Sequence, residues 1–478
     1  MGGKSTKTLN VKSSAELLSY IINVTPELRG EIDLPVQGQD IKSIGKIIMN
    51  NDRYKNAFLN TVNLIGLTVI DRNNDWDNPW ESFTDRGTLS YGQQVRELIN
   101  DLCNVYDYNE NFNDKERFLR TVVPNVLNYI HEVNFQKFYQ TTTSDAQMAM
   151  AFENDDLFGF IDTMISMLYE SYVYDRYVVC KYILCRRIVD GTVTPVQIAD
   201  FSTKTNREIV SDIKAVSNKM TFRSPNYNPA GVRRYTKFED QIAIVNTDFD
   251  AKFTTDVLAT SYFKSDAEMK AGLALIDSFS NHDEARLSDL FAKRDANGDP
   301  ISDTWIDGYV PFSGDDKTAL AEIPAVIISR DWFVCYRYAF DNGSGMKNTE
   351  WYNPTTLERN HFLHVWSVMS SSPFEQAVVF TQTAPNVTGV TVAPSTLTIL
   401  PTAVKQQVQF SATVATAGFA NKAVVWSVDS TAAAAGVTIN DQGLMTVPAN
   451  TLLTGITVTA TSVYKSSVSG TAAVTITQ

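Results

Sequence analysis

The sequence predicts an α+β body followed by an all-β C-terminal domain. Apolar residues recur at helical spacing in several separate stretches, and one such stripe continues for about thirty residues. Short β-branched and aromatic runs, which are typical of strands, are concentrated between residues 241 and 381. The last 93 residues instead contain brief Val and Thr runs separated by Gly and Pro. A chain of 478 residues is too long for a single core and suits two or three domains.

Residues 1–70 predict an N-terminal arm followed by helices. Lys4, Lys7 and Lys12 precede the first acidic residue, so the arm is basic. A helix is expected from Ser13, because Ser13 and Glu16 have the spacing of a capping box and apolar residues follow at helical spacing. Further helical repeats cover residues 41–48 and 58–65.

Residues 71–134 form a polar, acid-rich stretch of weak periodicity that ends in a strand-like run at 118–123. A long extension over other surfaces has this character, because it need not bury both of its own faces. Trp76 and Trp80 are candidate anchors of a subunit interface, since a few buried aromatic side chains dominate the binding energy of many interfaces. Packing of both side chains within their own subunit is the alternative.

A single apolar stripe over residues 157–188 predicts a helix about 45 Å long. This helix would be the structural spine of a domain that covers residues 135–200, with residues 351–385 returning to the same domain. Another helix is expected after Thr205, where Thr205 and Glu208 form a second capping box within residues 201–350. Strands are expected at residues 241–245, 325–329, 332–338, 362–369 and 377–381.

Residues 386–478 predict a small β-sandwich, with Trp426 as its central core aromatic side chain. The strand-like runs are residues 387–392, 408–414, 424–428, 456–461 and 472–476. This domain has five charged residues and 26 Ser or Thr, so its net charge is +1 and the remaining residues carry −14. A nearly uncharged, Thr-rich domain is suited to a position facing solvent.

Composition excludes several functional classes. A net charge of −13 has the wrong sign for a protein that grips phosphates over a broad basic surface, so general nucleic-acid binding is disfavoured. The sequence has no run of 18 or more apolar residues, and its start lacks the apolar core of a secretory signal. We therefore expect a soluble protein made in a cytoplasm, with no membrane partner.

The residues that carry most enzyme chemistry form no recognisable motif, so no catalytic, metal or cofactor site is expected. Cys180 and Cys185 lie about 140° apart around a helix and cannot hold one metal, and all four cysteines are expected to be buried free thiols. His361 and His364 lie on opposite faces of a predicted strand. The run at residues 295–299 imitates a calcium loop but lacks its Gly and Glu ligand positions, and a turn at Asn297-Gly298 explains it better.

Several stretches, and their order along the chain, together carry a family resemblance. In the body they are residues 64–70, 123–126, 131–139, 256–259, 276–279 and 364–366. The chain resembles the major capsid proteins of small, short-tailed, protein-primed bacteriophages of the phi-twenty-nine-like kind, whose body has the Hong Kong ninety-seven type capsid fold. In the C-terminal domain, residues 387–394, 410–414 and 424–428 resemble group 2 bacterial immunoglobulin-like domains.

The resemblance implies a structural subunit without enzymatic activity. Its parts would be the arm, an extended two-stranded loop laid over a neighbouring subunit, a peripheral domain with the spine helix, and an axial domain with a polar insertion near residues 280–321. The subunit would form hexamers and pentamers of an icosahedral or prolate shell in the virion, around double-stranded DNA that it does not bind specifically. Scaffolding and portal proteins are the implied partners, and Lys4, Lys7 and Lys12 would dock on a neighbour's acidic surface.

Two other classes of protein remain open at this point. One is a secreted or surface adhesin or carbohydrate-active protein, which the immunoglobulin-like resemblance suggests and the missing secretory signal opposes. The other is a minor virion protein of a tail or head fibre, which would be expected to show coiled-coil heptads or repeats.

Overall fold

The computed structural model describes residues 14–29, 41–58, 61, 76–90, 93–103, 126–131, 134–153, 157–251, 272–295, 300–306, 309–340, 345–356, 358–399, 404–451, 453 and 455–476. Helices and strands are interspersed along the body, which confirms the predicted α+β class. Two compact units share the chain. The first unit contains residues 1–96, 130–179 and 334–369, and the second contains residues 97–129, 180–333 and 370–478.

Three helices build the N-terminal core of the first unit. They are α1 (Ser14–Val24), α2 (Ile41–Met49) and α6 (Asp145–Glu153). Leu18, Ile21 and Ile48 are fully buried in one cluster with Phe58 and Met148. The helical spacing of the apolar residues thus correctly predicts α1 and α2, whereas the capping residue Ser13 and residues 62–65 lie outside the described residues.

The sheet of the first unit is built around β13 (Glu358–Ser371). This strand pairs antiparallel with β4 (Phe135–Ser144) over ten residues and with β12 (Met346–Asn353) over eight. The parallel pair of β1 (Thr88–Leu89) and β11 (Phe333–Tyr338) extends the same sheet. Alternate residues of β13 are buried, and Leu363 and Val365 pack with Tyr139, Tyr172 and Val173.

The predicted spine is confirmed as the 33-residue helix α7 (Leu157–Val189), which is about 50 Å long. Its second half is buried around most of its circumference, including the polar residues Asp175, Arg176 and Lys181. The helix ends at Val189, and the positive φ of 71° at Gly191, two residues later, permits the reversal of the chain. A side chain at this position would also collide with the backbone of Ala420, because a Cβ would lie 2.5 Å from its carbonyl oxygen.

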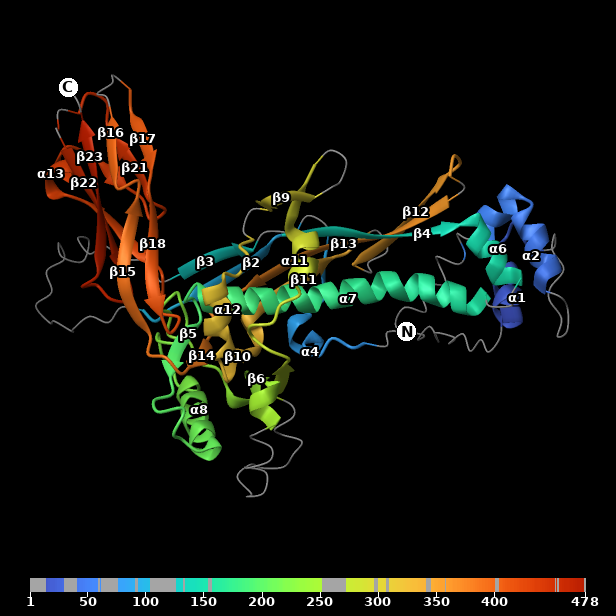
Figure 1. Ribbon diagram of the computed structural model, residues 1–478, viewed down its shortest axis with the longest axis horizontal. Helices are drawn as coiled ribbons and strands as arrows, with labels where there is room; N and C mark the ends of the chain where they lie inside the picture. Colours follow the sequence, from blue (N-terminus) through green and yellow to red (C-terminus); the bar gives the residue numbers. More distant parts are fainter. Residues whose placement is uncertain are drawn as a thin grey trace, which may run out of the picture. The chain divides into compact units, whose positions relative to one another are not determined.

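A five-stranded sheet forms the centre of the second unit, in the order β5 (Thr194–Gln197), β14 (Ala377–Thr381), β10 (Ala325–Ser329), β6 (Gln241–Asn246) and β7 (Leu273–Ile276). Helix α8 (Asn206–Met220) begins at the predicted capping box of Thr205 and Glu208. Its buried face, with Ile209 and Met220, packs on Ile327 and Phe380 of the sheet, and Figure 1 shows α8 below these strands. All five strands predicted for the body are present.

The polar stretch at residues 280–321 has regular structure of its own. Helix α11 (Glu284–Phe291) leads into a hairpin of β8 (Ala292–Arg294) and β9 (Pro300–Trp305), and α12 (Gly314–Ala321) follows. Tyr182 of α7 packs against the rings of Phe291, Tyr309 and Phe312, with centroids 4.9 to 5.9 Å away. The predicted turn at Asn297-Gly298 lies outside the described residues, although the strands on either side of it pair as a hairpin requires.

The C-terminal residues form an all-β sandwich. Its sheets are β15 (Asn386–Ala393) with β18 (Ser411–Ala417); β16 (Thr396–Ile399), β23 (Ser469–Ile476), β22 (Gly455–Ser462) and β19 (Val424–Val428); and β17 (Gln406–Gln409), β21 (Leu444–Val447) and β20 (Thr438–Ile439). A short helix, α13 (Ser430–Ala434), follows β19. Side chains from these sheets share one core.

Two details of the sequence prediction are wrong. The central aromatic side chain of the sandwich is Phe410, which is 1% exposed, whereas Trp426 is only partly buried at the side of the core. The residue Phe410 stands between β17 and β18, where the chain passes from one sheet to another, so strand alternation does not reveal its direction. Cys103 is exposed, although Cys180, Cys185 and Cys335 are buried free thiols as predicted.

The buried ring of His361 predicts a stability that falls in acid. It is 3% exposed, neither ring nitrogen has a hydrogen-bond partner, and burial together with the nearby charge of Arg359 lowers its pKa to about 4. In the unfolded chain His361 is therefore protonated below about pH 6.5, whereas in the folded chain it stays neutral down to about pH 4. Across this window the free energy of unfolding should fall by roughly 1 kcal/mol per pH unit from this group.

Replacing the ring tests this expectation. Chemical denaturation between pH 7 and pH 4 should show a smaller loss of stability for His361→Leu than for the wild type. The matched control is His364→Leu, on the other face of the same strand, where the ring is only half-buried and contacts the Thr349 hydroxyl. An unchanged pH slope in His361→Leu would show that the ring takes up its proton in the folded chain.

Candidate assembly surfaces

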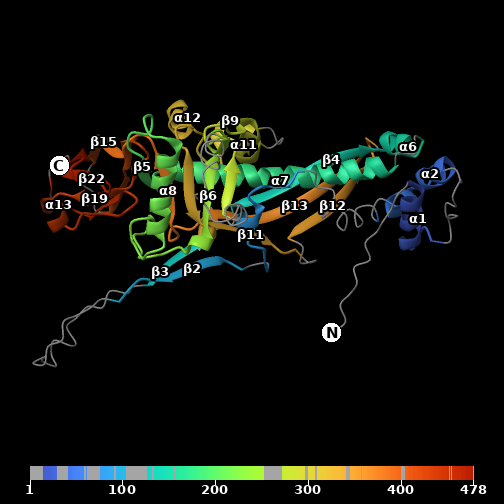
Figure 2. The ribbon, with the colours of Figure 1, turned by 90° about the horizontal axis from the view of Figure 1, so that it is seen from below.

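Within residues 71–134, the most exposed apolar side chains of the described part lie on or next to a two-stranded ribbon. It consists of β2 (Val95–Asn100) and β3 (Val126–His131), which pair only with each other among the described strands and run side by side in Figure 2. Residues 104–125, with the predicted strand at 118–123, lie outside the described residues. Five apolar side chains are 38 to 59% exposed here: Leu98, Leu127, Tyr129 and Ile130 on the ribbon, and Leu102, two residues beyond the end of β2.

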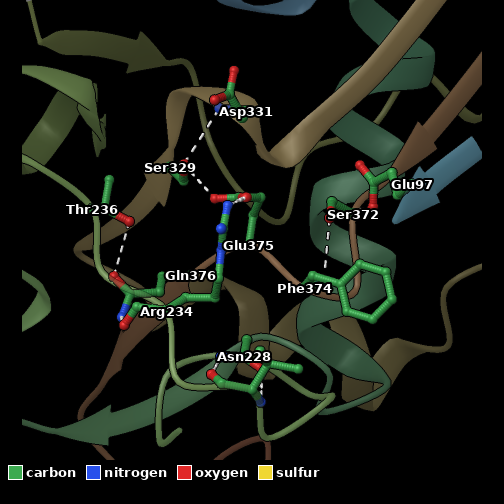
Figure 3. A network of polar contacts seen from close by, with 11 residues as sticks. Glu97, Asn228, Arg234, Thr236, Ser329, Asp331, Ser372, Phe374, Glu375 and Gln376 are labelled. Atoms are coloured by element: carbon green, nitrogen blue, oxygen red, sulfur yellow. Dashed lines mark hydrogen bonds and ion pairs between the residues drawn. The ribbon is translucent and has the colours of Figure 1, made fainter. Parts of the chain in front are cut away.

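The base of this ribbon is anchored in the second unit. The Ser372 hydroxyl donates a 2.7 Å hydrogen bond to the carboxylate of Glu97 and accepts one from the backbone N–H of Phe374, as Figure 3 shows. The ring of Tyr129 meets Phe374 edge to face, with centroids 6.4 Å apart. These contacts fix where the ribbon leaves the unit, and they leave Leu98, Leu127 and Ile130 at least 40% exposed.

A buried polar network holds the neighbouring loop in place (Figure 3). Arg234 forms an ion pair with Glu375, whose other oxygen accepts a 3.0 Å hydrogen bond from the Ser329 hydroxyl. The Thr236 hydroxyl donates to Gln376 at 2.8 Å, and the Gln376 amide donates back to the carbonyl of Arg234 at 3.0 Å. The loop before β6 is thereby held against the start of β14, so its exposed residues have a fixed position.

The two candidate tryptophans differ in exposure. Trp80 is fully buried, packed against Phe83 and Tyr177 with centroids 5.9 and 5.3 Å away, so packing within its own subunit describes it. Trp76 is 40% exposed and meets the rings of Tyr174 and Tyr177 edge to face. Trp76 therefore keeps a free face that a neighbouring subunit can cover, whereas Lys4, Lys7 and Lys12 lie outside the described residues.

A cluster of charges fixes this tryptophan segment on α7. The carboxylate of Asp85 lies 3.2 Å from the guanidinium of Arg176 and 2.8 Å from that of Arg337. Burial alone would raise the pKa of Asp85, but the two arginines and the backbone N–H of Gly87 outweigh burial and hold that pKa below its ordinary value. Arg176 is itself only 5% exposed, so it depends on Asp85 and on the more distant Glu81 for compensation.

The described part of the chain holds several His and Cys side chains. No three side chains of His, Cys, Asp or Glu gather within it as a metal site would require. His361 and His364 do point to opposite faces of β13. Burial raises the pKa of the Cys185 thiol to about 12, which is the opposite of what a nucleophile needs. Among the described helices, none has the length and apolarity to cross a membrane.

Comparison with known proteins identifies the class of this subunit. Residues 23–381 match the family model described as Phi29-like phage major capsid protein. A shell subunit of a tailed bacteriophage is the class that this match defines, and it agrees with the α+β body, its spine helix and its ribbon. The chain belongs to the Phi29-like phage major capsid protein family. It is a structural component of the virion that assembles in many copies into a shell, and the adhesin and minor-virion alternatives are not favoured.

Individual relatives are similar over most of their length. The chain is 28% identical over 420 residues to the major capsid protein of Bacillus phage PZA, covering 86% of this chain and 82% of that protein. It is 27% identical over 454 residues to the major capsid protein of Bacillus phage B103, covering 93% and 89%. Residues 1–385 make up only about four-fifths of the chain, so both alignments must extend into the C-terminal sandwich.

Two of the solved structures that match this chain are more distant in sequence than these relatives. The capsid structure of Staphylococcus phage Andhra has a TM-score of 0.45 and 12% identity, covering 64% of this chain and 84% of that one. The mature capsid of bacteriophage PhiM1 has a TM-score of 0.35 and 10% identity, covering 62% and 84%.

We expect the subunit to lose stability when the Asp85 carboxylate is removed from the charge cluster. Asp85→Asn leaves the buried guanidinium of Arg176 without its nearer partner, so the free energy of unfolding should fall by roughly 2 kcal/mol. The control Asp52→Asn removes a carboxylate whose side chain is 87% exposed and lies 3.2 Å from Lys55, and it should change stability by less than about 0.5 kcal/mol. Equal melting temperatures for the two variants would contradict this account of the cluster.

Proposed function

We propose that this capsid subunit assembles into hexamers and pentamers of an icosahedral or prolate shell, with the β2–β3 ribbon laid over an adjacent copy. The exposed apolar side chains of the ribbon carry the proposal. An isolated two-stranded ribbon is at best marginally stable in water, so three or more strands or a packed face are needed. This ribbon has no third strand among the described residues, and Leu98, Leu127 and Ile130 are at least 40% exposed.

Covering these side chains would contribute substantially to assembly. Full burial of one Leu or Ile side chain is worth about 1.5–3 kcal/mol, and these side chains are already partly covered. A neighbouring surface that covers five of them therefore gains several kcal/mol per subunit before the entropy lost on association. The free energy of each contact between subunits is modest. In a closed shell these contributions add, because every subunit is held by several neighbours at once.

Other exposed groups are proposed to join the same contacts. The free face of Trp76 is proposed as an aromatic anchor of the same interface, and its tyrosine neighbours pre-position it. The arm with Lys4, Lys7 and Lys12 is proposed to dock on a neighbour's acidic surface, since the body of each copy carries −14. Trp80 supports these contacts indirectly by fixing the segment on α7.

The C-terminal sandwich is proposed to be an immunoglobulin-like module of group 2 that faces outward and decorates the shell. It has its own core and a net charge of only +1, as an autonomous solvent-facing module would. The body would supply the shell by itself. The family match, residues 23–381, lies entirely within residues 1–385.

The remaining proposals concern partners and chemistry. Scaffolding and portal proteins are proposed as assembly partners, and packaged double-stranded DNA as cargo that the acidic body does not bind specifically. The subunit is proposed to have no catalytic activity and to be made in the cytoplasm of the bacterial host. A shell subunit acts through matched surfaces and not through a reactive side chain.

Removing the apolar character of the ribbon should abolish shell formation. Leu98→Ser/Leu102→Ser changes two side chains that are 59% and 50% exposed, so the melting temperature of the subunit should change little while sedimenting particles disappear. The matched control is Val425→Ser/Val463→Ser on the C-terminal sandwich, with exposures of 59% and 53%. Shells of normal yield from the Leu98 and Leu102 variant would contradict the ribbon's proposed role.

Truncation tests the role of the sandwich. A chain ending at Ala384 should still form particles of normal size in negative-stain microscopy, because the sandwich is proposed to decorate the shell. The truncation removes one close backbone contact between the sandwich and the body: Gly418 packs so tightly that a Cβ there would lie 2.5 Å from the carbonyl oxygen of Thr383. Failure of the truncated chain to form any shell, while its helical content stays intact, would show that the sandwich is part of shell closure.

A further inference from the structure

Charge is segregated within the second unit. Between Asp212 and Glu239 the chain has six Lys or Arg and no acidic residue. The segment at residues 280–321, here called the acidic insertion, has nine Asp or Glu and four Lys or Arg. A chain whose net charge is −13 thus carries one strongly basic segment and one strongly acidic segment in the same unit.

The basic segment forms an exposed patch in which aromatic and basic side chains alternate. Phe222, Tyr235 and Phe238 are 72%, 46% and 62% exposed. The two chain segments that carry them are joined by backbone hydrogen bonds between Ser224 and Arg234 and from the N–H of Thr236 to the carbonyl of Met220. The guanidinium of Arg223 lies 5.7 Å from the ring centre of Tyr235. We call Lys219, Phe222, Arg223, Tyr235, Lys237 and Phe238 the basic patch.

Among the described residues, carboxylates do not neutralise most of the positive charges of this patch. Arg234 turns inward to Glu375 in the network of Figure 3, and Arg233 lies 3.1 Å from Asp101. By contrast, neither Lys219 nor Arg223 meets a carboxylate among the described residues. Lys237 has only a loose 3.6 Å pair with Glu239, and both side chains are more than 60% exposed. The patch therefore presents positive charge beside apolar rings, a composition that favours a protein interface.

The acidic insertion has the complementary character. Asp289 and Asp315 are exposed and form no ion pair among the described residues. Other acidic residues of the insertion have partners: Glu284 pairs with Lys317, and Asp283 and Asp316 cap helices α11 and α12. Figure 1 shows α11 and β9 of the insertion above the central sheet of the second unit, whereas α8, which leads into the basic patch, lies below it. The two surfaces thus belong to different sides of one unit.

We propose that the basic patch binds the acidic insertion of the adjacent copy within each ring of subunits, an inference that rests on the proposed shell function. A contact between two different surfaces of the same chain is heterologous, and repeating it head to tail closes a ring. A symmetric contact would instead set basic patch against basic patch. The complementary charges orient each subunit, and the rings of Phe222 and Tyr235 supply apolar area at the centre of the contact.

Charge reversal tests the pairing. Lys219→Glu/Arg223→Glu and, separately, Asp289→Lys/Asp315→Lys should each lower the yield of sedimenting particles roughly tenfold or more, because like charges then face each other. The chain that carries all four substitutions should regain particles. The control Lys405→Glu/Lys422→Glu makes the same charge change as the first variant on the C-terminal sandwich and should assemble like the wild type. Circular dichroism of each subunit shows whether it is folded.

A mixture of the two reversed chains gives the sharpest result. In each reversed chain both surfaces have the same sign, so its patch fits only the insertion of the other chain. The two chains must therefore alternate around a ring. Six-membered rings can alternate and five-membered rings cannot, so microscopy of the mixture should show hexamers without pentamers or closed shells.

Other results would separate failure of this pairing from failure of the shell function. Normal shells from either reversed chain, or no recovery in the chain with four substitutions, would overturn the pairing and leave the shell function intact. Normal shells that retain less DNA in Lys219→Glu/Arg223→Glu would show that the patch faces the genome, and would also overturn it. Absence of particles from the wild type under all conditions would overturn the shell function itself.

Discussion

The exposure of apolar side chains on both faces of the β2–β3 ribbon is the constraint on which the rest of the account depends. A ribbon of two strands cannot bury its own side chains, so water meets Leu98, Leu127 and Ile130 until another surface covers them. Among the described residues, the ribbon is held at its base by the hydrogen bond between Ser372 and Glu97 and the contact of Tyr129 with Phe374. Directly after β2, Asp101 also pairs with Arg233. The apolar area of the ribbon is therefore available for a neighbouring copy of a protein whose family builds shells.

The two units are built as rigid supports. In the first unit β13 has partners on both sides, and its buried alternate residues pack on α7, where the Asp85 carboxylate compensates the buried Arg176. In the second unit the central sheet is covered by α8, and the Arg234 and Glu375 network holds the loop before β6. The carboxylates of Asp85 and Glu375 each have two partners, so removing either carboxylate is destabilising and loosens the residues next to it.

Sequence predicted the parts of the fold that local periodicity determines. The stripe that became α7, the capping box at Thr205 and the five body strands follow from side chains within a few residues of each other. It could not predict the depth of Trp80, because Tyr177 covers this side chain from nearly a hundred residues away. The choice of Trp426 over Phe410 is wrong because Phe410 stands between two strands, where alternation does not reveal its direction. The exposed thiol of Cys103 also differs from the prediction. For the candidate surfaces, composition indicated an extended segment but not Ser372, Glu375 or the basic patch, which depend on contacts made by the folded chain.

Hydrogen exchange of the free subunit and of assembled particles tests the central claim most directly. In the free subunit the backbone amides of β2 and β3 should exchange rapidly, because a solvated two-stranded ribbon opens easily. In particles the same amides should be protected by a large factor, while those of α7, already buried within the subunit, should change little. Equal exchange of the ribbon in the two states would contradict the account, because it would mean that no neighbouring copy covers it.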